Sequence, residues 1–361
     1  MMNNSEENIV EKFGLEKINY DLLSRIDSSD ILIKRKLLTY VRGSKELEEA
    51  INTKNFYVLT GVMPSFEKIH FGTFGVIKAV KFFQKSAKFS IVLVADVEAY
   101  LTRNIPYEKA KEIAYNIHIP TYLSLGLSEK TIFYFQSENK SLIKIATDVA
   151  KNITLNNFRE VYGDISPERI YSSTFQIADI LFPQLIRKIY PIIPVGIDQD
   201  PHLRLCRDYV RKTNSFDFLL PIGIYIKTIP SLSGEEKMSK SKPEDAIFLP
   251  EEENVLRKKI FSAFSGGGIT IEEHRKKGAN LDIDVCYRIL EFVDESDKFY
   301  EMSEKYRKGE ILSGEFKEYT FYVLQNFMRE FREKLEYYRD FVKKGNIIEI
   351  HSIEELKEFI E

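Results

Sequence analysis

Three short segments carry side chains whose types and spacing suit phosphate chemistry. The first is His70-Phe71-Gly72-Thr73, which lies between a loop and an amphipathic stretch. Backbone N–H groups at the start of a helix attract phosphate, and an imidazole there can donate to an α-phosphate whose charge reorganises. Gly72 would let an adenine ring lie against the backbone. The alternative reading is a histidine that only turns the chain before a helix.

The second segment, Gly196-Ile197-Asp198-Gln199-Asp200-Pro201, closes an apolar run. A carboxylate can accept from both hydroxyls of a ribose, and a glutamine amide can accept from an ammonium while donating to a carboxylate. These residues therefore suit a nucleoside and an amino acid together. In the alternative reading, the acids only cap the helix that follows.

The third segment is Lys237-Met238-Ser239-Lys240-Ser241, in a stretch rich in Gly, Ser and Glu that offers no apolar face. We expect an exposed loop whose flexible lysines hold a pyrophosphate as negative charge builds on it. A merely solvated lysine loop is the alternative, but this five-residue string is far more specific than a generic charge run.

The elements that must position these segments alternate between strands and helices. Residues 56–61, 90–96, 131–135 and 192–198 read as strands, and residues 72–85, 107–126 and the stretches from 142 and 201 read as helices. Such alternation predicts an α/β fold, a Rossmann-type nucleotide-binding domain with a parallel sheet covered by helices. Both the first and the second segment then follow a strand, at the edge where ligands bind in open α/β sheets.

The chain divides into three predicted parts. Apolar spacing in residues 31–52 reads as helical, so residues 1–52 are predicted to form an N-terminal helical cap. Residues 53–250 form the Rossmann-type domain. From residue 253 the apolar positions recur at helical spacing, with a long candidate over 314–344, so residues 251–361 are predicted to form a helical domain.

Composition limits the class of protein. Of 361 residues, 43% are hydrophobic and 30% charged, which argues against a disordered or fibrous chain. Two cysteines and five scattered histidines predict neither a disulfide framework nor a metal site built by the protein. No apolar run reaches signal-peptide or transmembrane length, so we expect a cytoplasmic protein without a membrane partner. A net charge of −3 leaves nucleic-acid binding open.

The order of the first and third segments resembles class I aminoacyl-tRNA synthetases, which pair a His-x-Gly-His-like element with a later Lys-Met-Ser-Lys-Ser-like loop. Within that class the chain is similar to tryptophanyl-tRNA synthetases of the archaeal and eukaryotic type. The resemblance covers about residues 18–317, and its most specific stretch is AFSGGGITIEEHRKKGANLDIDV, because tyrosyl enzymes share the first domain's plan and lack it. The other resembling stretches are LTGVMPS from Leu59 and PVGIDQDPHLRLCRD from Pro194.

The resemblance implies a function and a role for each matching residue. The function is ATP-dependent activation of tryptophan and its transfer to tRNA(Trp). The implied catalytic residues are His70, Lys237 and Lys240. The two lysines would stabilise the leaving pyrophosphate, with Mg²⁺ bridging the phosphates, and His70 would contact ATP. Glu98 and Gln176 would lie near the substrate ammonium, and Gln199 near its carboxylate. The implied ATP contacts are Thr60, Gly61, His70, Gly72, Thr73, Gly196, Asp198 and Met238.

The resemblance also implies a homodimer and an anticodon-binding role for residues 251–361. We expect Arg275, Asn280 and Asp282 to contact the anticodon, because single-stranded bases are read by such hydrogen-bonding side chains.

Two departures from the family pattern bear on the substrate. Thr73 stands at the last position of the His-x-Gly-His-like element, and a hydroxyl cannot carry charge. Leu59 and Leu93 occupy positions where eukaryotic relatives place polar groups near the indole ring, so another group must accept the indole N–H. A tyrosyl enzyme and a non-catalytic, synthetase-like tRNA-binding protein remain alternatives. A nucleotidyltransferase that shares only the His-x-Gly element is disfavoured by the helical second domain.

Overall fold

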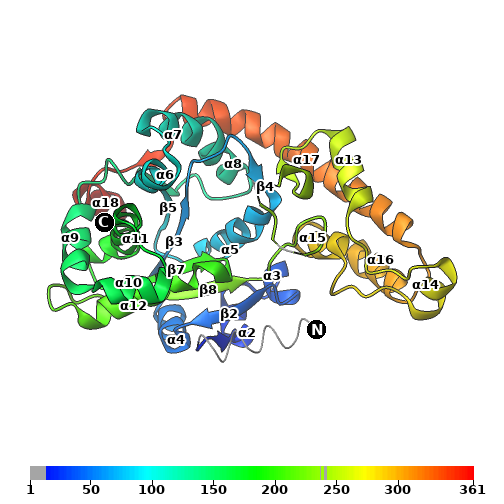
Figure 1. Ribbon diagram of the computed structural model, residues 1–361, viewed down its shortest axis with the longest axis horizontal. Helices are drawn as coiled ribbons and strands as arrows, with labels where there is room; N and C mark the ends of the chain where they lie inside the picture. The colour runs from blue at the N-terminus through cyan, green and yellow to red at the C-terminus, as the bar shows by residue number, and fades with distance from the viewer. Residues whose placement is uncertain (1–13, 236, 240–241) are drawn as a thin grey trace.

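An eight-stranded mixed sheet forms the centre of the computed structural model, which describes residues 14–235, 237–239 and 242–361 (Figure 1). Its strands, in spatial order, are β1 (Glu16–Lys17), β2 (Leu38–Arg42), β8 (Ile222–Ile226), β7 (Tyr190–Val195), β3 (Phe56–Val62), β5 (Ser90–Val94), β6 (Ile132–Phe135) and β10 (Ile348–Glu349). A separate antiparallel pair joins β4 (Ile69–His70) to β9 (Phe248–Leu249).

The six strands from β8 to β10 run parallel, and β1 and β2 add an antiparallel edge. The central strands are apolar on both faces, as strands covered by helices on two sides require. In β3, for example, Phe56 and Val58 join one core cluster, while Tyr57 and Leu59 join the other. The prediction of an α/β fold with a parallel sheet is confirmed.

Helices cover both faces of the sheet. Those before residue 125 are α2 (Tyr20–Asp27), α3 (Ile31–Lys34), α4 (Ser44–Thr53), the turn η1 (Phe71–Thr73), α5 (Phe74–Gln84), α6 (Asp96–Arg103), α7 (Tyr107–Ile113), the π-helical turn η2 (Ala114–His118) and α8 (Ile119–Ser124). Those that follow, up to the third segment, are α9 (Leu142–Asn152), α10 (Leu155–Tyr162), α11 (Pro167–Leu181), η3 (Phe182–Leu185), η4 (Ile197–Gln199) and α12 (Asp200–Lys212).

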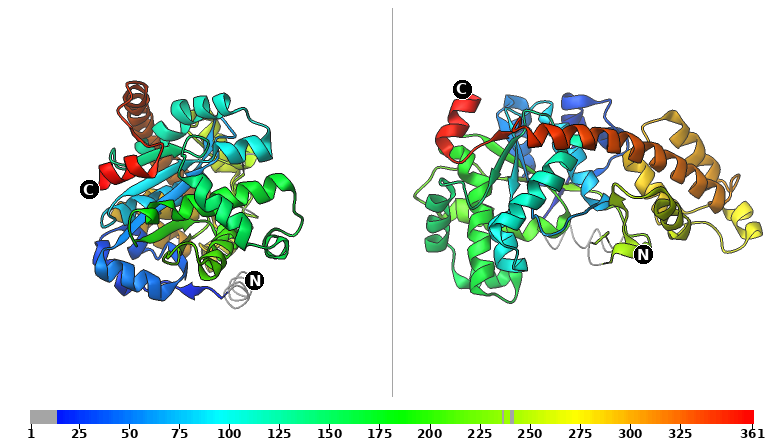
Figure 2. Two further views of the ribbon diagram at one scale, coloured as in Figure 1. Left: turned by 90° about the vertical axis from the view of Figure 1, so that its left-hand side faces the viewer. Right: turned by 90° about the horizontal axis from the view of Figure 1, so that it is seen from above.

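The C-terminal part is mainly helical and extends away from the sheet (Figure 1). It contains η5 (Pro243–Asp245), α13 (Glu253–Ser262), α14 (Ile271–Lys277), α15 (Val285–Val293), α16 (Asp297–Arg307), α17 (Ser313–Lys343) and α18 (Ile353–Ile360). Figure 2 shows α17 running from this helical part back to the sheet, where it packs against α8. Among the helices of the described residues, not one combines the length and apolar composition needed to cross a bilayer.

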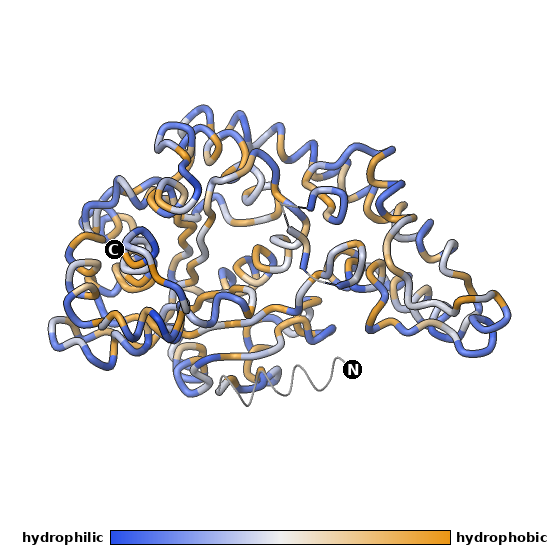
Figure 3. Tube along the Cα trace, in the orientation of Figure 1, coloured by the Kyte–Doolittle hydropathy of each residue, from blue (hydrophilic) through white to orange (hydrophobic). Residues whose placement is uncertain are grey.

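The helical part is tied to the sheet by a shared core and by charged contacts. One apolar cluster runs continuously from α2 to α17, and Figure 3 shows apolar residues along the strands and the inward helix faces. Arg35 lies 3.9 Å above the Phe299 ring and donates to backbone carbonyls at the end of α15. Lys227, directly after β8, pairs with the buried Glu291 at 2.8 Å. These contacts hold the helical part against the domain that carries the predicted site.

The N-terminal region differs from the predicted helical cap. From residue 14 onward, where the structure describes this region, the helices are α2, α3 and α4, while Leu38–Arg42 form β2 and pair with β8. The buried residues of β2 are Leu38 and Val41, and this three-residue spacing of apolar positions suits a helix as well as a short strand. Lys36 and Gly43, with φ of 53° and 93°, interrupt a continuous helix on either side of β2.

The end of the chain also differs from the predicted all-helical domain. After α17, Ile348 and Glu349 pair with β6 as the last strand of the sheet, and α18 packs beside η3. The buried Ile350 follows them, so apolar and polar residues alternate over 348–350 as in a strand. This short strand covers the edge of β6 that would otherwise lack a hydrogen-bonding partner. The C-terminal part is thus mainly helical from α13 to α17, and its last residues differ from the prediction because they add a strand to the sheet. The boundary near residue 250 stays a prediction.

A buried carboxylate joins the antiparallel edge of the sheet to the helix that follows the second predicted segment. Asp200, at the start of α12, receives a two-point contact from the Arg42 guanidinium, with distances of 2.6 and 2.9 Å. Tyr225 of β8 donates to the same carboxylate. The side chain of Asp200 is 3% exposed and that of Arg42 12%. Asp200 is thus a structural anchor that sets the position of Asp198 and Gln199.

We predict that Asp200→Ala lowers the free energy of unfolding by about 3–5 kcal/mol, because it removes the carboxylate that balances the charge of the largely buried Arg42 guanidinium. Denaturant unfolding followed by circular dichroism measures the change. Asp208→Ala, which removes an exposed pair with Arg211, is the matched control and should cost under about 1 kcal/mol. Equal effects of the two substitutions would show that the buried pair has no special role.

Candidate functional site

One cavity of about 460 Å³ opens at the carboxyl edge of the parallel sheet. This volume lies within the range of small-molecule sites. Segments that follow β3, β5, β6, β7 and β8 all contribute to it, because parallel strands end at the same edge. Of the predicted residues, the structure brings together Thr60, Gly61, His70, Gly72, Thr73, Glu98, Gln176, Gly196, Asp198, Gln199, Lys237 and Met238.

The cavity lies at the point where the order of strands reverses. From β3 the chain moves to β5 and β6 on one side, and then returns to β7 and β8 on the other. The loops after β3 and β7 therefore leave the sheet in opposite directions and open a crevice between them. Gly196 lies at this point, where an added Cβ would stand 2.6 Å from the Asp198 carboxylate oxygen. A side chain at Gly196 would displace that carboxylate.

The first predicted segment reaches the cavity through β4 and η1. His70 pairs with Phe248 of β9, which fixes its backbone, and Gly72 and Thr73 lead into α5. An added Cβ at Gly72 would lie 2.9 Å from the His70 ring. Because the first turn of α5 also lines the cavity, the positive end of its dipole faces the space. This end of the cavity suits an anion.

The second and third predicted segments meet at an ion pair. The Nζ atom of Lys237 lies 2.6 Å from a carboxylate oxygen of Asp198, and Gln199 donates to the same oxygen at 2.9 Å. Burial would raise the pKa of the Asp198 carboxyl, but the hydrogen bonds from Lys237 and Gln199 outweigh it and hold the pKa below its ordinary value. The Lys237 side chain is 58% exposed and the Asp198 side chain is 45% exposed. Lys240 lies outside the described residues.

Glu98 and Gln176 form a second polar group at another part of the cavity. Glu98 lies in the first turn of α6, and Gln176 in α11 donates to its carboxylate. Burial raises the pKa of the Glu98 carboxyl, and this hydrogen bond offsets part of the shift. The Oε1 atom of Gln176 is shielded from solvent and accepts no hydrogen bond within the described residues. A carboxylate and an unused amide oxygen suit a ligand ammonium.

Asp179 is a lining residue that the sequence reasoning missed. Its side chain is buried, and it accepts a hydrogen bond of 2.8 Å from Tyr134 and another from Gln136. Burial raises the pKa of Asp179 to about 7, despite these two donors. Leu59 and Leu93 line the same cavity. An apolar wall with one buried carboxylate suits a flat apolar ligand that carries a single hydrogen-bond donor.

A signal for Asp179 was present in the sequence. It follows Gln176 by three residues in the run TFQIADILF, so both side chains lie on one face of a helix that is otherwise apolar. An acid at a core position of such a helix calls for a buried partner.

Gln136 and His202 also line the cavity without having been predicted. Gln136 ends the apolar strand β6 at the carboxyl edge, and its Oε1 accepts from the backbone N–H of Glu98. Because its Nε2 also donates to Asp179, the Gln136 amide connects the backbone of Glu98 to the side chain of Asp179. His202 lies four residues after Asp198, receives a hydrogen-bond contact of 2.7 Å from Tyr162, and has its pKa lowered by burial to about 4. His202 is therefore a neutral imidazole.

The predicted anticodon residues lie far from this cavity, around α14 at the distal end of the helical part (Figure 1). All three are exposed. The Arg275 guanidinium donates to the Gly309 carbonyl at 2.7 Å, and the Asn280 side chain accepts from the backbone of Asp282. Arg275 and Asn280 thus have local structural partners, and their contact with a base stays a prediction.

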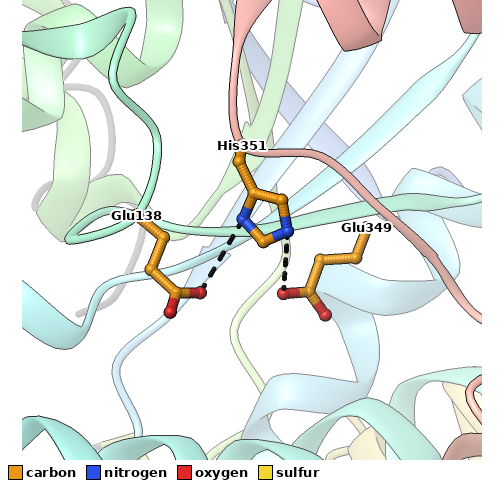
Figure 4. Close-up of side chains that lie close together, drawn as sticks. All are labelled: Glu138, Glu349 and His351. Atoms are coloured by element: carbon orange, nitrogen blue, oxygen red, sulfur yellow. Dashed lines mark ion pairs between the residues drawn. The ribbon is translucent and has the colours of Figure 1, made fainter.

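A group able to hold a metal ion is found among the described residues, but away from the cavity. Figure 4 shows His351 between Glu138 and Glu349, near the end of β10. A carboxylate oxygen of Glu138 lies 3.8 Å from the His351 Nδ1 atom, and a carboxylate oxygen of Glu349 lies 4.0 Å from its Nε2 atom. Lys111 and Tyr115 pair with the two carboxylates. Within the cavity, Asp198 is a carboxylate beside Lys237, and carboxylate and phosphate oxygens are the ligands that Mg²⁺ prefers.

Comparison with known proteins gives a consistent result. Residues 51–329 match the family described as "tRNA synthetases class I (W and Y)". The tryptophan–tRNA ligase of Methanocaldococcus jannaschii is 35% identical over 347 residues, which cover 93% of each chain, and that of Methanopyrus kandleri is 32% identical over 92% of each.

Solved structures agree with the sequence comparison. The tryptophanyl-tRNA synthetase of Aeropyrum pernix K1 superposes with a TM-score of 0.86 at 31% identity, over 96% of both chains. The enzyme from Encephalitozoon cuniculi, solved bound to tryptophan, superposes with a TM-score of 0.84 at 26% identity, over 97% of this chain and 98% of that one. This chain therefore belongs to the class I tRNA synthetases of the tryptophan and tyrosine family.

Proposed function

We propose that this protein is a tryptophan–tRNA ligase, which uses ATP to make tryptophanyl adenylate and then transfers the amino acid to tRNA(Trp). One observation carries the proposal: the side chains that suit a nucleotide and those that suit an amino acid line the same cavity. The relatives that cover more than nine-tenths of the chain are tryptophan–tRNA ligases. They do not support the tyrosyl enzyme that the sequence left open. Because this reaction serves translation, we also propose a cytoplasmic location.

ATP would lie across the loops that follow β3 and β7. The start of α5, with His70, Gly72 and Thr73, suits the phosphates, because helix N–H groups and an imidazole all donate. Asp198 suits the ribose hydroxyls, since a carboxylate accepts from both. The remaining contacts that we propose for ATP are Thr60, Gly61, Gly196 and Met238.

The first step needs positioning and charge stabilisation rather than a protein nucleophile. A carboxylate oxygen of tryptophan attacks the α-phosphorus, a new P–O bond forms, and the bond to the bridging oxygen breaks as pyrophosphate leaves. Lys237 would move from Asp198 to the pyrophosphate. Breaking the Lys237–Asp198 pair should cost little free energy, because both side chains are about half exposed. We propose the same role for Lys240. Mg²⁺ would bind ATP phosphate oxygens, with Asp198 as a nearby carboxylate.

The amino acid would lie between the two polar groups of α6 and α11. Its ammonium suits the Glu98 carboxylate and the unused Oε1 of Gln176. Gln199 would hold its carboxylate near the nucleotide. The indole ring would pack on Leu59 and Leu93, and its N–H would donate to Asp179. A chain with leucines at those two positions would therefore recognise the indole N–H through Asp179.

tRNA(Trp) would span the molecule from the cavity to the distal end of the helical part. We propose that Arg275, Asn280 and Asp282 contact the anticodon there, since all are exposed. The length of α17 separates these two ends (Figure 2).

We also propose a homodimer. Tyr100 of α6 and Tyr171 of α11 are 48% and 53% exposed, and Tyr107 stacks on Tyr100 with ring centres 4.8 Å apart. Such exposed aromatic groups are typical of interfaces. Sedimentation velocity tests this proposal, and a fully active monomer would refute it.

The proposed function predicts that the protein exchanges pyrophosphate into ATP when tryptophan is present. Tyrosine and phenylalanine should support exchange at least about 100-fold less well, because neither presents the indole N–H to Asp179 from the same ring position. Steady-state exchange with each amino acid measures this. Exchange with tyrosine and not with tryptophan would overturn the proposed substrate.

Lys237→Ala should slow adenylate formation roughly 100-fold, because a cation that meets negative charge in the transition state is lost. The dissociation constant for tryptophan should change less than about threefold, since Lys237 lies on the nucleotide side. Single-turnover kinetics and equilibrium titration separate the two. Lys237→Arg should recover part of the rate. Equal losses of tryptophan binding and rate would point to misfolding instead.

Tryptophan binding should weaken as the pH falls below about 7, because protonation of Asp179 replaces a carboxylate acceptor by a neutral one. The expected change is about tenfold between pH 8 and pH 6. Asp179→Asn should bind tryptophan more weakly at pH 8 and lose this pH dependence. Titrations of both proteins across this range measure it, and an unchanged pH dependence in Asp179→Asn would assign the effect to another group.

A further inference from the structure

Two carboxylates and an imidazole lie together where the C-terminal segment joins the central sheet. Glu138 follows the end of β6, Glu349 is the last residue of β10, and His351 comes two residues later. Taking one ligand atom from each side chain, all three atoms lie within 4.8 Å of one another. Figure 4 shows both carboxylates pointing toward the same imidazole ring. Imidazole and carboxylate groups are common ligands of divalent transition metals in proteins.

Each carboxylate has one oxygen engaged by a donor and the other turned toward the ring. For Glu138, the Oε1 atom contacts the Lys111 ammonium, and the Oε2 atom lies 3.8 Å from the His351 Nδ1 atom. For Glu349, the Oε2 atom accepts a hydrogen bond of 2.7 Å from Tyr115, and the Oε1 atom lies 4.0 Å from the ring Nε2 atom. Both ring distances are too long for hydrogen bonds. The ring and these two oxygens therefore face one another without bonding.

The outer donors match what a metal site needs. A carboxylate that binds a metal is itself hydrogen-bonded, because a second donor fixes its orientation. Lys111 of α7 and Tyr115 of η2 supply such donors from outside the group. Two carboxylates and one ammonium leave a net charge of −1 when the imidazole is neutral, which is the form that binds metals. A divalent cation would therefore still meet negative charge.

The backbone holds the three residues in place without help from an ion. Glu349 pairs with Phe133 in the ladder between β10 and β6. The Lys140 N–H donates to the His351 carbonyl at 3.0 Å, so the turn that carries Glu138 is tied to the C-terminal segment. Bonds of about 2.0–2.2 Å to a tetrahedral ion place ligand atoms roughly 3.3–3.6 Å apart, so the side-chain tips must close by about 1 Å. The backbone need not move.

The group is accessible to an ion and is also partly shielded from water. The His351 side chain is 45% exposed, that of Glu138 32% and that of Glu349 17%. Burial raises the pKa of the Glu349 carboxyl, because the Tyr115 hydrogen bond and the nearby charges do not fully replace the lost water. A cation bound beside this carboxylate would offset that cost.

We propose that Glu138, Glu349 and His351 bind a divalent first-row transition-metal ion such as Zn²⁺, with water completing its coordination. The imidazole favours such an ion over Mg²⁺. The ion would link the turn after β6 to the C-terminal segment, and would thereby fasten β10 and α18 to the sheet. Local spacing along the chain does not show the group, because only the pairing of β10 with β6 brings its members together. This inference is independent of the proposed function.

Calorimetric titration of the metal-free protein with Zn²⁺ tests the site. His351→Gln and Glu138→Gln should each weaken one binding event about tenfold or more, because an amide is a poorer ligand than an imidazole or a carboxylate. Glu358→Gln, which removes an exposed carboxylate from α18, is the matched control and should leave binding unchanged. Zn²⁺ that binds elsewhere contributes equally to all of these proteins. Mg²⁺ should bind to the parent protein at this group at least about 100-fold more weakly.

Co²⁺ reports on the ligands directly, because its visible absorption bands depend on the number and type of the ligating atoms. The parent protein should develop Co²⁺ bands that added Zn²⁺ removes. His351→Gln should lose the contribution of the ring nitrogen to these bands, and Glu358→Gln should keep it. Far-ultraviolet circular dichroism checks that each variant is folded. Glu138 lies in a turn, so Glu138→Gln provides the same test if His351→Gln does not fold.

Hydrogen exchange followed by mass spectrometry tests what the ion does to the C-terminal segment. In the parent protein, Zn²⁺ at about 100 times its dissociation constant should slow exchange in residues 348–361 by up to about 100-fold, where opening of the segment breaks the site. Peptides from α14, which lies far from the group, should exchange at the same rate with and without Zn²⁺. In His351→Gln, Zn²⁺ should change neither region.

Three results would overturn the proposal. Equal Zn²⁺ binding by the parent protein and His351→Gln would show that the imidazole only pairs with the two carboxylates. Equal affinity of the parent protein for Mg²⁺ and Zn²⁺ would assign binding to the carboxylates alone. Unchanged exchange in residues 348–361 at saturating Zn²⁺ would show that the ion does not fasten this segment.

Discussion

Six strands of the sheet run parallel, and this single constraint brings the site together. Parallel strands present their carboxyl ends at one edge, so segments that are more than a hundred residues apart in the chain lie side by side there. The reversal of strand order between β3 and β7 then opens a crevice, because the loops after these strands leave in opposite directions. Buried anchors such as the Arg42–Asp200 pair hold the flanking elements in place.

The cavity is polar at both ends, and the two ends differ in sign. At the end that we propose for the nucleotide, the start of α5 and the ammonium of Lys237 favour negative charge. At the other end, Glu98 and Asp179 favour donors, and the Gln136 amide connects the backbone N–H of Glu98 to the carboxylate of Asp179. A molecule with an ammonium and a ring N–H fits one end, and a triphosphate fits the other. This order of charges supports an amino-acid activation reaction, in which a carboxylate must lie between the two ends.

Periodicity predicted the fold class correctly, because long apolar runs that alternate with amphipathic helices leave few architectures open. It failed where segments were short. Within residues 38–42, Leu38 and Val41 are buried at a spacing that also suits a helix, and pairing with β1 and β8 selects the strand. Residues 348–349 form a strand because the edge of β6 is free, which is a property of the folded sheet and not of the local sequence.

The sequence alone determined the three motif segments, their order and the chemistry of their side chains, since these depend on residue type and local spacing. Tertiary structure decided which other residues join them. Asp179 is read locally as one acid in an apolar helix, and it becomes a lining group only because α11 packs its Gln176 face toward the end of β6. Contacts between distant segments arise from packing, and spacing along the chain does not encode them one by one.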